Sequence, residues 1–153
     1  MKRHFTTTVY LLTDDKVLLL FHPKLKKWLP PGGHIKPNES PPMAARREVF
    51  EETGLEFIFI NEENIWVERW NAKSFERPYM CLMEEIPEHN GTAAHQHMDF
   101  IYLGKPIGKI APVSEDPIQW FTYDEIEAFK DDEEIFVETK EVLRTLLPTE
   151  VLL

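Results

Sequence analysis

Three glutamates, Glu48, Glu51 and Glu52, lie within one five-residue stretch of the chain. Residues three and four positions apart share a face of an α-helix, so a helix here brings these carboxylates together. Like charges held so close repel one another unless protons or cations neutralise them. Carboxylate oxygens suit hard cations such as Mg2+ and Mn2+. The spacing therefore predicts a site for Mg2+ or Mn2+.

The sequence also predicts the helix that these glutamates need, from Pro41 to Thr53. Ser40 is a favourable N-cap, and Pro41 fits the first helical position because its missing N–H would be unpaired there anyway. Gly54 can take the left-handed conformation that ends a helix at little cost. Small apolar residues can dock another part of this helix to a core while the acidic face looks outward; they are Ala44, Ala45 and Val49.

A longer pattern surrounds the glutamates. Its nine defined positions, spread over 23 residues, are Gly33, Glu39, Arg47, Glu48, Val49, Glu51, Glu52, Gly54 and Leu55. This spacing resembles the complete Nudix box, and the chain is identified as a member of the MutT-like Nudix hydrolase family. A pattern this long is far more specific than a lone glycine motif. The approach to the loop, Trp28 to Gly33, and the stretch from Trp120 to Ile126 are also similar to the family, whereas Ile58 to Gly91 matches no motif of it.

The resemblance implies an enzyme that hydrolyses a phosphoanhydride bond in a nucleoside diphosphate linked to another group. Such a reaction needs the phosphate charge neutralised, the water aligned and a proton accepted. By resemblance, Mg2+ or Mn2+ would be bound by Gly33, through its backbone carbonyl, and by Glu48, Glu51 and Glu52. The candidate catalytic residues are Glu48, Arg47 and Glu51.

Among these residues Glu48 is the expected general base and Glu52 chiefly a ligand. Arg47 is expected to orient the carboxylates, and Glu39 to brace the loop and the helix start. Family members differ in which carboxylate acts as base. Glu115, in a proline-flanked loop before the last strand, is therefore kept as a reserve candidate. The alternative function is a catalytically silent Nudix domain that binds a nucleotide or metabolite as a sensor module.

A second group of polar residues lies between Gln96 and Tyr102. Strand alternation places Met98, Phe100 and Tyr102 on one face, predicted to be core, and His97, Asp99 and Ile101 on the other. The second face is predicted to line the substrate cleft, with His97 and Asp99 as candidate substrate-binding residues. The alternative that stays open is a satisfied His97–Asp99 pair near a strand end. His95 extends the polar row, but a His-x-His zinc site lacks a third ligand of recognisable spacing.

Composition places limits on partners and compartment. The chain of 153 residues suits a single domain over 1–153, and its hydrophobic fraction of 42% is that of a globular protein. The net charge of -10 opposes binding to a nucleic-acid duplex or a membrane surface. The partner that the family resemblance implies is a small nucleoside diphosphate derivative. Lone Cys81 and the absence of a long apolar run predict a cytoplasmic protein. Either a monomer or a homodimer is expected.

The remaining pattern predicts one mixed domain, α+β or α/β in class. The family fold implied by the resemblance is a mixed β-sheet sandwiched between α-helices. Strands are expected at Phe5 to Leu12, Lys16 to Phe21, Phe57 to Ile60, Ile65 to Trp70, Tyr79 to Glu85, His97 to Leu103 and Ile118 to Phe121. Two further helices are expected at Asp124 to Lys130 and Ile135 to Leu147, and Asn90-Gly91 predicts a turn.

Overall fold

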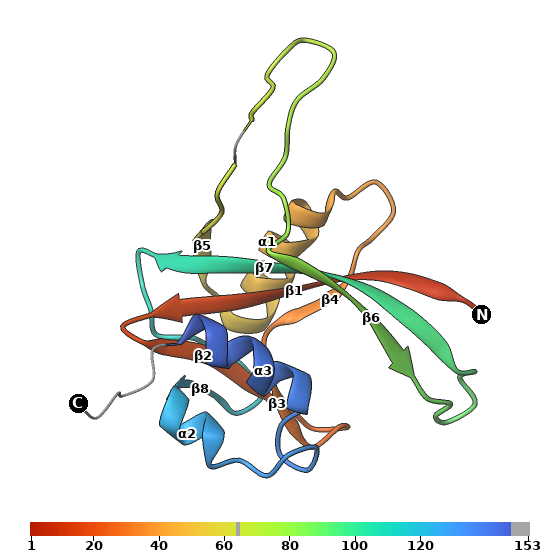
Figure 1. Cartoon of the computed structure of the whole chain (residues 1–153), viewed down its shortest axis with the longest axis vertical. Coiled ribbons are helices and arrows are strands. Elements are labelled where there is room, and N and C mark those ends of the chain that lie inside the picture. Colours follow the sequence, from red (N-terminus) through yellow and green to blue (C-terminus); the bar gives the residue numbers. More distant parts are fainter. Residues whose placement is uncertain (64, 148–153) are drawn as a thin grey trace.

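The computed structural model describes residues 1–63 and 65–147, which form a mixed sheet of eight strands with helices on both faces (Figure 1). The strands are β1 (Arg3–Thr13), β2 (Lys16–His22), β3 (Lys27–Leu29), β4 (Gly32–His34), β5 (Glu56–Phe59), β6 (Met80–Ile86), β7 (His95–Ile107) and β8 (Ile118–Thr122). The helices are α1 (Pro41–Thr53), α2 (Tyr123–Glu127) and α3 (Val137–Leu146). The predicted sandwich of a mixed sheet between helices is confirmed, and its class is α+β.

The sheet brings together residues that are distant in the sequence. Its strand order is β3-β2-β1-β7-β5, with β4 paired to β1, β6 to β7 and β8 to β2. The parallel pairing of β1 with β7 puts His4 beside His97 and Thr6 beside Asp99. The antiparallel pairing of β4 with β1 puts His34 opposite Thr6. Because paired residues share a sheet face, these five side chains project to the same side.

Strand alternation builds a separate core on each face of the sheet. Val9 and Leu11 of β1 pack with residues of α1, whereas Tyr10 packs with residues of α2 and α3. On β7, Tyr102 was predicted to lie in the core, and this is confirmed, since it is 1% exposed. The opposite face is not uniformly polar, because Ile101 and Leu103 join the core under α2 and α3. The polar row of β7 therefore ends at Asp99.

Helix α1 has the predicted bounds and the predicted caps. The Ser40 hydroxyl accepts a hydrogen bond from the backbone N–H of Met43, 3.4 Å away. Gly54 ends the helix with φ of 71°, and its N–H donates to the carbonyl of Phe50. Ala44, Ala45 and Val49 are fully buried, so the helix is anchored through its apolar side. The glutamates of the box are left on the side that faces the loop and solvent.

The segment between β5 and β6, of which residues 60–63 and 65–79 are described, projects from the body as an arm (Figure 1). The predicted strand from Ile65 to Trp70 is wrong, since these residues form no strand and Glu68 makes an isolated bridge with Lys73 of the same arm. A β-branched and aromatic run favours a strand only where a sheet edge is available to pair with it. Trp70 is 95% exposed at the tip.

Other boundaries moved by a few residues. The turn at Asn90-Gly91 is confirmed, with φ of 47° and 81°. Strand β7 begins early, at His95, and α2 and α3 are shorter than the predicted helices. The short strands β3 and β4 were not predicted. Within the described residues, no helix has the length and apolar character needed to cross a membrane.

Candidate functional site

Strand β4, which leads into the loop before α1, lies very close to its surroundings at both of its glycines, Gly32 and Gly33. A Cβ on Gly33 would lie 2.6 Å from the carboxyl group of Glu48, and a Cβ on Gly32 would collide with the carbonyl oxygen of Thr7. The backbone N–H of Gly32 donates a hydrogen bond to Glu52 Oε1 at 2.9 Å. The missing side chains therefore let two glutamates of α1 lie directly against the loop.

Arg47 connects the remaining acidic groups of the box. Its Nε and Nη2 donate to both oxygens of Glu39 at 2.7 and 2.8 Å, a bidentate pair. Its Nη1 donates to Glu48 at 2.9 Å and to Glu51 at 3.3 Å, and Nη2 also donates to the carbonyl of His34. The hydrogen bonds from Arg47 lower the pKa of Glu39 to about 2. The guanidinium of Arg47 thus contacts the carboxylates of Glu39, Glu48 and Glu51.

Glu52 lies in surroundings that disfavour its charge. Burial raises the pKa of Glu52 to about 7, and the charges of Glu48 and Asp116 act in the same direction, against the hydrogen bond from Gly32. Without a cation, the second negative charge of the Glu48–Glu52 pair is therefore costly. A hard divalent ion would reverse this cost, because oxygen donors of this kind are its preferred ligands. The donor set of the loop and helix fits Mg2+ or Mn2+.

Glu51 differs from its two neighbours. Its side chain is 54% exposed and pairs with Arg47. Asp116 is half-buried in the loop before β8, and its charge helps to raise the pKa of Glu52. The neighbouring Glu115 is exposed.

Asp99 is buried on the other face of the sheet, under the polar ends of β1 and β6. It is 3% exposed and accepts hydrogen bonds from the hydroxyls of Thr6 and Thr8, at 3.1 and 2.8 Å. Burial, and then the charge of Asp99, raise the pKa of Glu84 to about 8. Burial likewise raises the pKa of Asp99. At neutral pH this acid pair therefore retains a proton.

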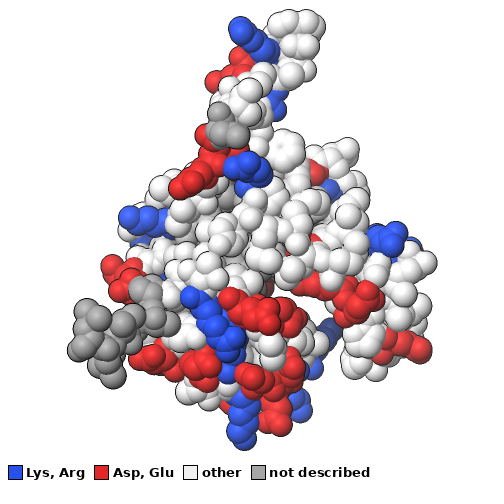
Figure 2. Space-filling view, viewed as in Figure 1, with Lys and Arg blue, Asp and Glu red and all other residues white. Residues whose placement is uncertain are grey.

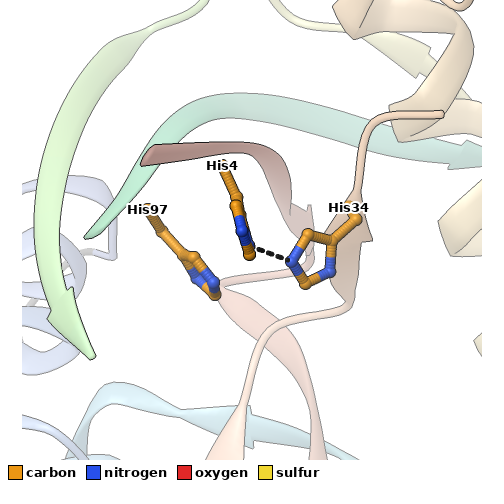
Figure 3. Close-up of side chains that lie close together, drawn as sticks. All are labelled: His4, His34 and His97. Atoms are coloured by element: carbon orange, nitrogen blue, oxygen red, sulfur yellow. Dashed lines mark hydrogen bonds between the residues drawn. The ribbon is translucent and has the colours of Figure 1, made fainter. Parts of the chain in front are cut away.

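His97 lies among other histidines. The rings of His4, His34 and His95 lie with their centroids 5.9, 5.1 and 5.0 Å from that of His97. Figure 3 shows His4, His34 and His97 projecting from three different strands toward one another. Burial lowers the pKa of His97 to about 4, and the nearby histidines act in the same direction. His97 thus contacts other histidines, and Asp99 accepts hydrogen bonds from Thr6 and Thr8. The two residues do not form the alternative His97–Asp99 pair.

The sequence pointed to part of this arrangement. The structure brings Gly33, Glu48 and Glu52 together, with Arg47 linking Glu48 to Glu51. It places His97 and Asp99 on the opposite sheet face, one in a histidine group and one in a buried acid pair. The residues missed from sequence are His4, His34 and Glu84. Of the two acids in the loop before β8, Glu115 was the candidate kept, whereas Asp116 is the one whose charge affects Glu52. The alternation of His4, Thr6 and Thr8 along the first strand was a usable signal, since it marks one face of β1 as polar before Tyr10.

Comparison with known proteins gives matches over most of the chain. A family model described as NUDIX domain matches residues 2–142. A protein of Lactococcus lactis subsp. cremoris named "Probable DHNTP pyrophosphohydrolase" is 31% identical over 100 residues, which is 64% of this chain and 51% of that protein. "Uncharacterized Nudix hydrolase YvcI" of Bacillus subtilis is 46% identical over 52 residues, which is 34% of this chain and 33% of that protein. The matches thus span about half and about a third of these two relatives.

Solved structures match the whole fold more evenly. A NUDIX-family hydrolase from Clostridium perfringens has a TM-score of 0.72 and 29% identity, and the match covers 95% of this chain and 99% of the other. A NUDIX hydrolase from Nitrosomonas europaea has a TM-score of 0.58 and 26% identity, with 83% and 77% of the two chains covered.

Proposed function

The chain belongs to the Nudix family, and from this premise we propose that it hydrolyses a phosphoanhydride bond in a small nucleoside diphosphate derivative. The observation that carries the proposal is the meeting of Glu48 and Glu52 at the two glycines of β4, Gly32 and Gly33. Two half-buried carboxylates without a cation are costly, and the pKa of Glu52, about 7, reflects that cost. A divalent cation and a phosphate-bearing substrate would together neutralise such a site.

The proposed roles of the chain's residues follow from their contacts. Glu48, Glu51, Glu52 and the carbonyl of Gly33 are the oxygen donors that would bind Mg2+ or Mn2+. When bound, the cation neutralises the charge of the diphosphate and polarises the attacking water. Glu48 accepts the proton of that water. Arg47 is a positioning residue, which holds Glu48 through Nη1 while Glu39 fixes its other side.

His97 and Asp99 are proposed to bind a part of the substrate away from the phosphate that reacts, since they lie on the other face of the sheet from Glu48. His97 is half-buried there and Asp99 lies beneath it, two residues further along β7. If these residues contribute to substrate binding, His97→Gln and Asp99→Asn should raise KM more than they lower kcat. An equal loss of kcat and kcat/KM would instead place them in the chemical step.

The test is a compound screen with the full chain in Mg2+ or Mn2+, with products identified by 31P NMR. The panel holds ordinary and oxidised nucleoside triphosphates, ADP-ribose, dinucleoside polyphosphates, nucleotide sugars and DHNTP, the compound in the name of the L. lactis relative. We expect hydrolysis of one class, lost in Glu52→Gln. If a compound raises the melting temperature but none is hydrolysed, the chain is the silent sensor module instead.

The proposal includes a setting for the enzyme. We take residues 1–153 as a single domain that works in the cytoplasm as a monomer or homodimer, although residues 148–153 lie outside the described part. The two cores share one sheet, which supports a single domain. The net charge of -10 and lone Cys81 support a small-molecule substrate and a reducing compartment.

A further inference from the structure

Four of the six histidines in the chain gather on one face of the sheet. They are His4 of β1, His34 of β4, and His95 and His97 of β7. One ligand atom from each of His4, His34 and His97 lies within 4.8 Å of the other two. Among the described residues, these three histidines are the one group of three or more His, Cys, Asp or Glu side chains whose ligand atoms all lie within this distance of one another. Chain folding, not local sequence, creates the group, because β1 lies between β4 and β7.

The distance between His4 and His34 suits two ligands of one metal ion, and His97 lies near enough to complete the site with a small side-chain movement. Nδ1 of His4 lies 3.3 Å from Nε2 of His34 (Figure 3). Two nitrogens bound to one tetrahedral zinc ion are separated by roughly 3.3 Å, given zinc–nitrogen bonds of about 2.0–2.1 Å. A single hydrogen bond between two imidazoles would give a similar distance for one pair. It would not require a third ring to point at the same place, as His97 does in Figure 3.

The surroundings also favour a cation. Glu84 is paired in register with His97 across β6 and β7, so its side chain lies on the same face. Asp99 is the next residue of that face along β7. Two positive groups, Lys2 and Arg3, directly precede His4, and both are exposed to solvent, which screens their charge. The site therefore has an acidic side and an open side toward solvent at His34.

His95 keeps this arrangement in place. It is 9% exposed, and its Nδ1 lies 2.9 Å from the carbonyl oxygen of Ala93, to which it can donate. Its Nε2 lies 3.2 Å from Nε2 of His97. Because the carbonyl of Ala93 fixes the His95 ring, His95 limits the rotation of the His97 ring. Residues next to metal-bound histidines commonly have this effect. His95 is thus a positioning residue behind His97.

We propose that His4, His34 and His97 form a second metal site, which binds a transition-metal cation of the Zn2+ class and leaves a further coordination position open. Three imidazole nitrogens select Zn2+, Cu2+, Ni2+ or Fe2+ over Mg2+, whereas the glutamates of α1 offer only oxygen. A site with three histidines and an open position can bind water or an oxygen of a ligand. The site is separate from the carboxylates, because His34 projects to the sheet face opposite the one that Glu48 contacts at Gly33.

The test is a titration of the full metal-free chain with Zn2+ in excess Mg2+, which occupies the carboxylate site. Calorimetry gives the affinity and stoichiometry. Co2+ absorption in the same buffer reports whether the ion has a tetrahedral nitrogen environment. His34→Gln is the first variant, because His34 is exposed and its loss leaves the core intact. His97→Gln is the second. His89→Gln, in the exposed turn between β6 and β7, is the matched control.

We expect one equivalent of Zn2+ to bind to the wild type and to His89→Gln, with affinity lower by about tenfold or more in His34→Gln and His97→Gln. Imidazole 15N shifts of His4, His34 and His97 should change on binding, and those of His22 and His89 should not. The proposal is overturned if the wild type shows no saturable Zn2+ binding, or if both variants bind as the control does. The outcome does not depend on hydrolysis, so it can succeed or fail independently of the proposed function.

Discussion

At the scale of single residues, neighbouring positions of β4 face two different groups of side chains, the glutamates of α1 and the histidines. Gly33 lies against the carboxyl group of Glu48 on the α1 side, and the next residue, His34, projects to the histidine side. Alternation along a strand is enough to divide them. Glu48 and Glu52 therefore lie on one face and the imidazoles on the other, and we expect the first group to prefer hard cations and the second to prefer borderline cations.

Glu52 gives a prediction about pH. Its pKa is about 7 in the folded chain against an ordinary value of 4.5, so between these values the folded state binds more protons than the unfolded state. Its contribution to stability is therefore present below pH 4.5 and is lost as the pH rises through 7. In EDTA, Glu52→Gln should equal or exceed the wild type in melting temperature at pH 8 and lose this advantage at pH 5.

The same variant should gain less stability than the wild type when Mg2+ is added, since a ligand that binds the native state stabilises it by mass action. Melting curves at both pH values, with EDTA and with Mg2+, give all four comparisons. A variant that melts well below the wild type in EDTA at pH 8, with an unchanged Mg2+ response, would show that Glu52 is a structural group.

Gly33 gives a prediction about the loop. In Gly33→Ala the new Cβ would lie 2.6 Å from the Glu48 carboxyl group, so that carboxyl group must move. We expect the Mg2+-dependent gain in melting temperature to fall sharply, and turnover with it, because a small displacement of a catalytic group costs about a hundredfold in rate. Alanine at this position with normal turnover would mean that the contact of Glu48 with the loop is not needed.

The sequence indicated the carboxylate site but not the histidine site, for a physical reason. Glu48 and Glu52 are one helical turn apart, so local periodicity determines that they meet. His4, His34 and His97 meet only through the registers of β1 with β4 and β7. Register between distant strands depends on the whole sheet and is not encoded within a short window.

At the scale of elements, a buried lysine joins α2 to α3. Lys140 is 4% exposed, and its Nζ donates to the carbonyls of Glu127 and Phe129 while it forms an ion pair with Asp131. An ammonium group has three N–H donors, so all of them have partners. The carbonyls at the end of α2, which lack partners within the helix, are thereby satisfied.

Lys140→Met keeps the apolar stem but removes these donors. We expect a loss of about 2 kcal/mol in unfolding free energy, because hydrogen bonds to a charged group are lost and carbonyls are left unpaired. Urea denaturation measures it. Lys105→Met, at an exposed position of β7, is the control and should stay within about 0.5 kcal/mol. Equal stability of the two variants would contradict this account of the α2–α3 junction.

Gly54 gives a second prediction at this scale. Its φ of 71° is strained for a side chain, and a Cβ at this position would meet no atom closer than 3.7 Å, so the cost of a substitution is conformational. Gly54→Ala should lose about 1 kcal/mol. Gly54→Asn should lose less, since asparagine tolerates this region. Equal losses in the two variants, or none, would mean that α1 ends in another way in solution.

The elements differ in how far sequence predicted them. Helix α1 was predicted to the residue because Ser40, Pro41 and Gly54 act locally. The stretch from Ile65 to Trp70 has strand-forming residues but no neighbouring strand, and local propensity cannot show that. Strands β3 and β4 are only three residues long, too short for alternation to be recognised.

At the scale of the whole molecule, charge and exposed apolar surface are unevenly distributed. Figure 2 shows acidic side chains gathered around α2 and α3, with a largely uncharged surface between this region and the arm. The arm carries exposed large apolar side chains, among them Ile65, Trp66, Trp70 and Phe75. Its base is held to the body by hydrogen bonds from Tyr102 to the carbonyl of Glu76 and from Tyr79 to Ile101.

The arm should be separable from the stability of the body. Val67 and Ser74 close its outer part through two 2.8 Å hydrogen bonds, so residues 68–73 beyond them can be deleted and replaced by a two-residue Asn-Gly turn. We expect this deletion to change the unfolding free energy by less than about 1 kcal/mol, because shortening a loop has a small entropic effect. Tyr102→Phe, which removes the contact at the base, should cost more. A large loss on deleting the tip would show that the arm belongs to the folded core.

The central claim is that the carboxylates of α1 bind the cation that hydrolysis needs. The most direct measurement is turnover of a substrate identified in the screen, for the wild type and Glu52→Gln, in EDTA and after Mg2+ is restored. The account predicts no turnover in EDTA, full recovery of the wild type with Mg2+, and a loss of orders of magnitude in a folded Glu52→Gln. Full activity in rigorously metal-free buffer, or near-normal turnover of Glu52→Gln, would contradict it.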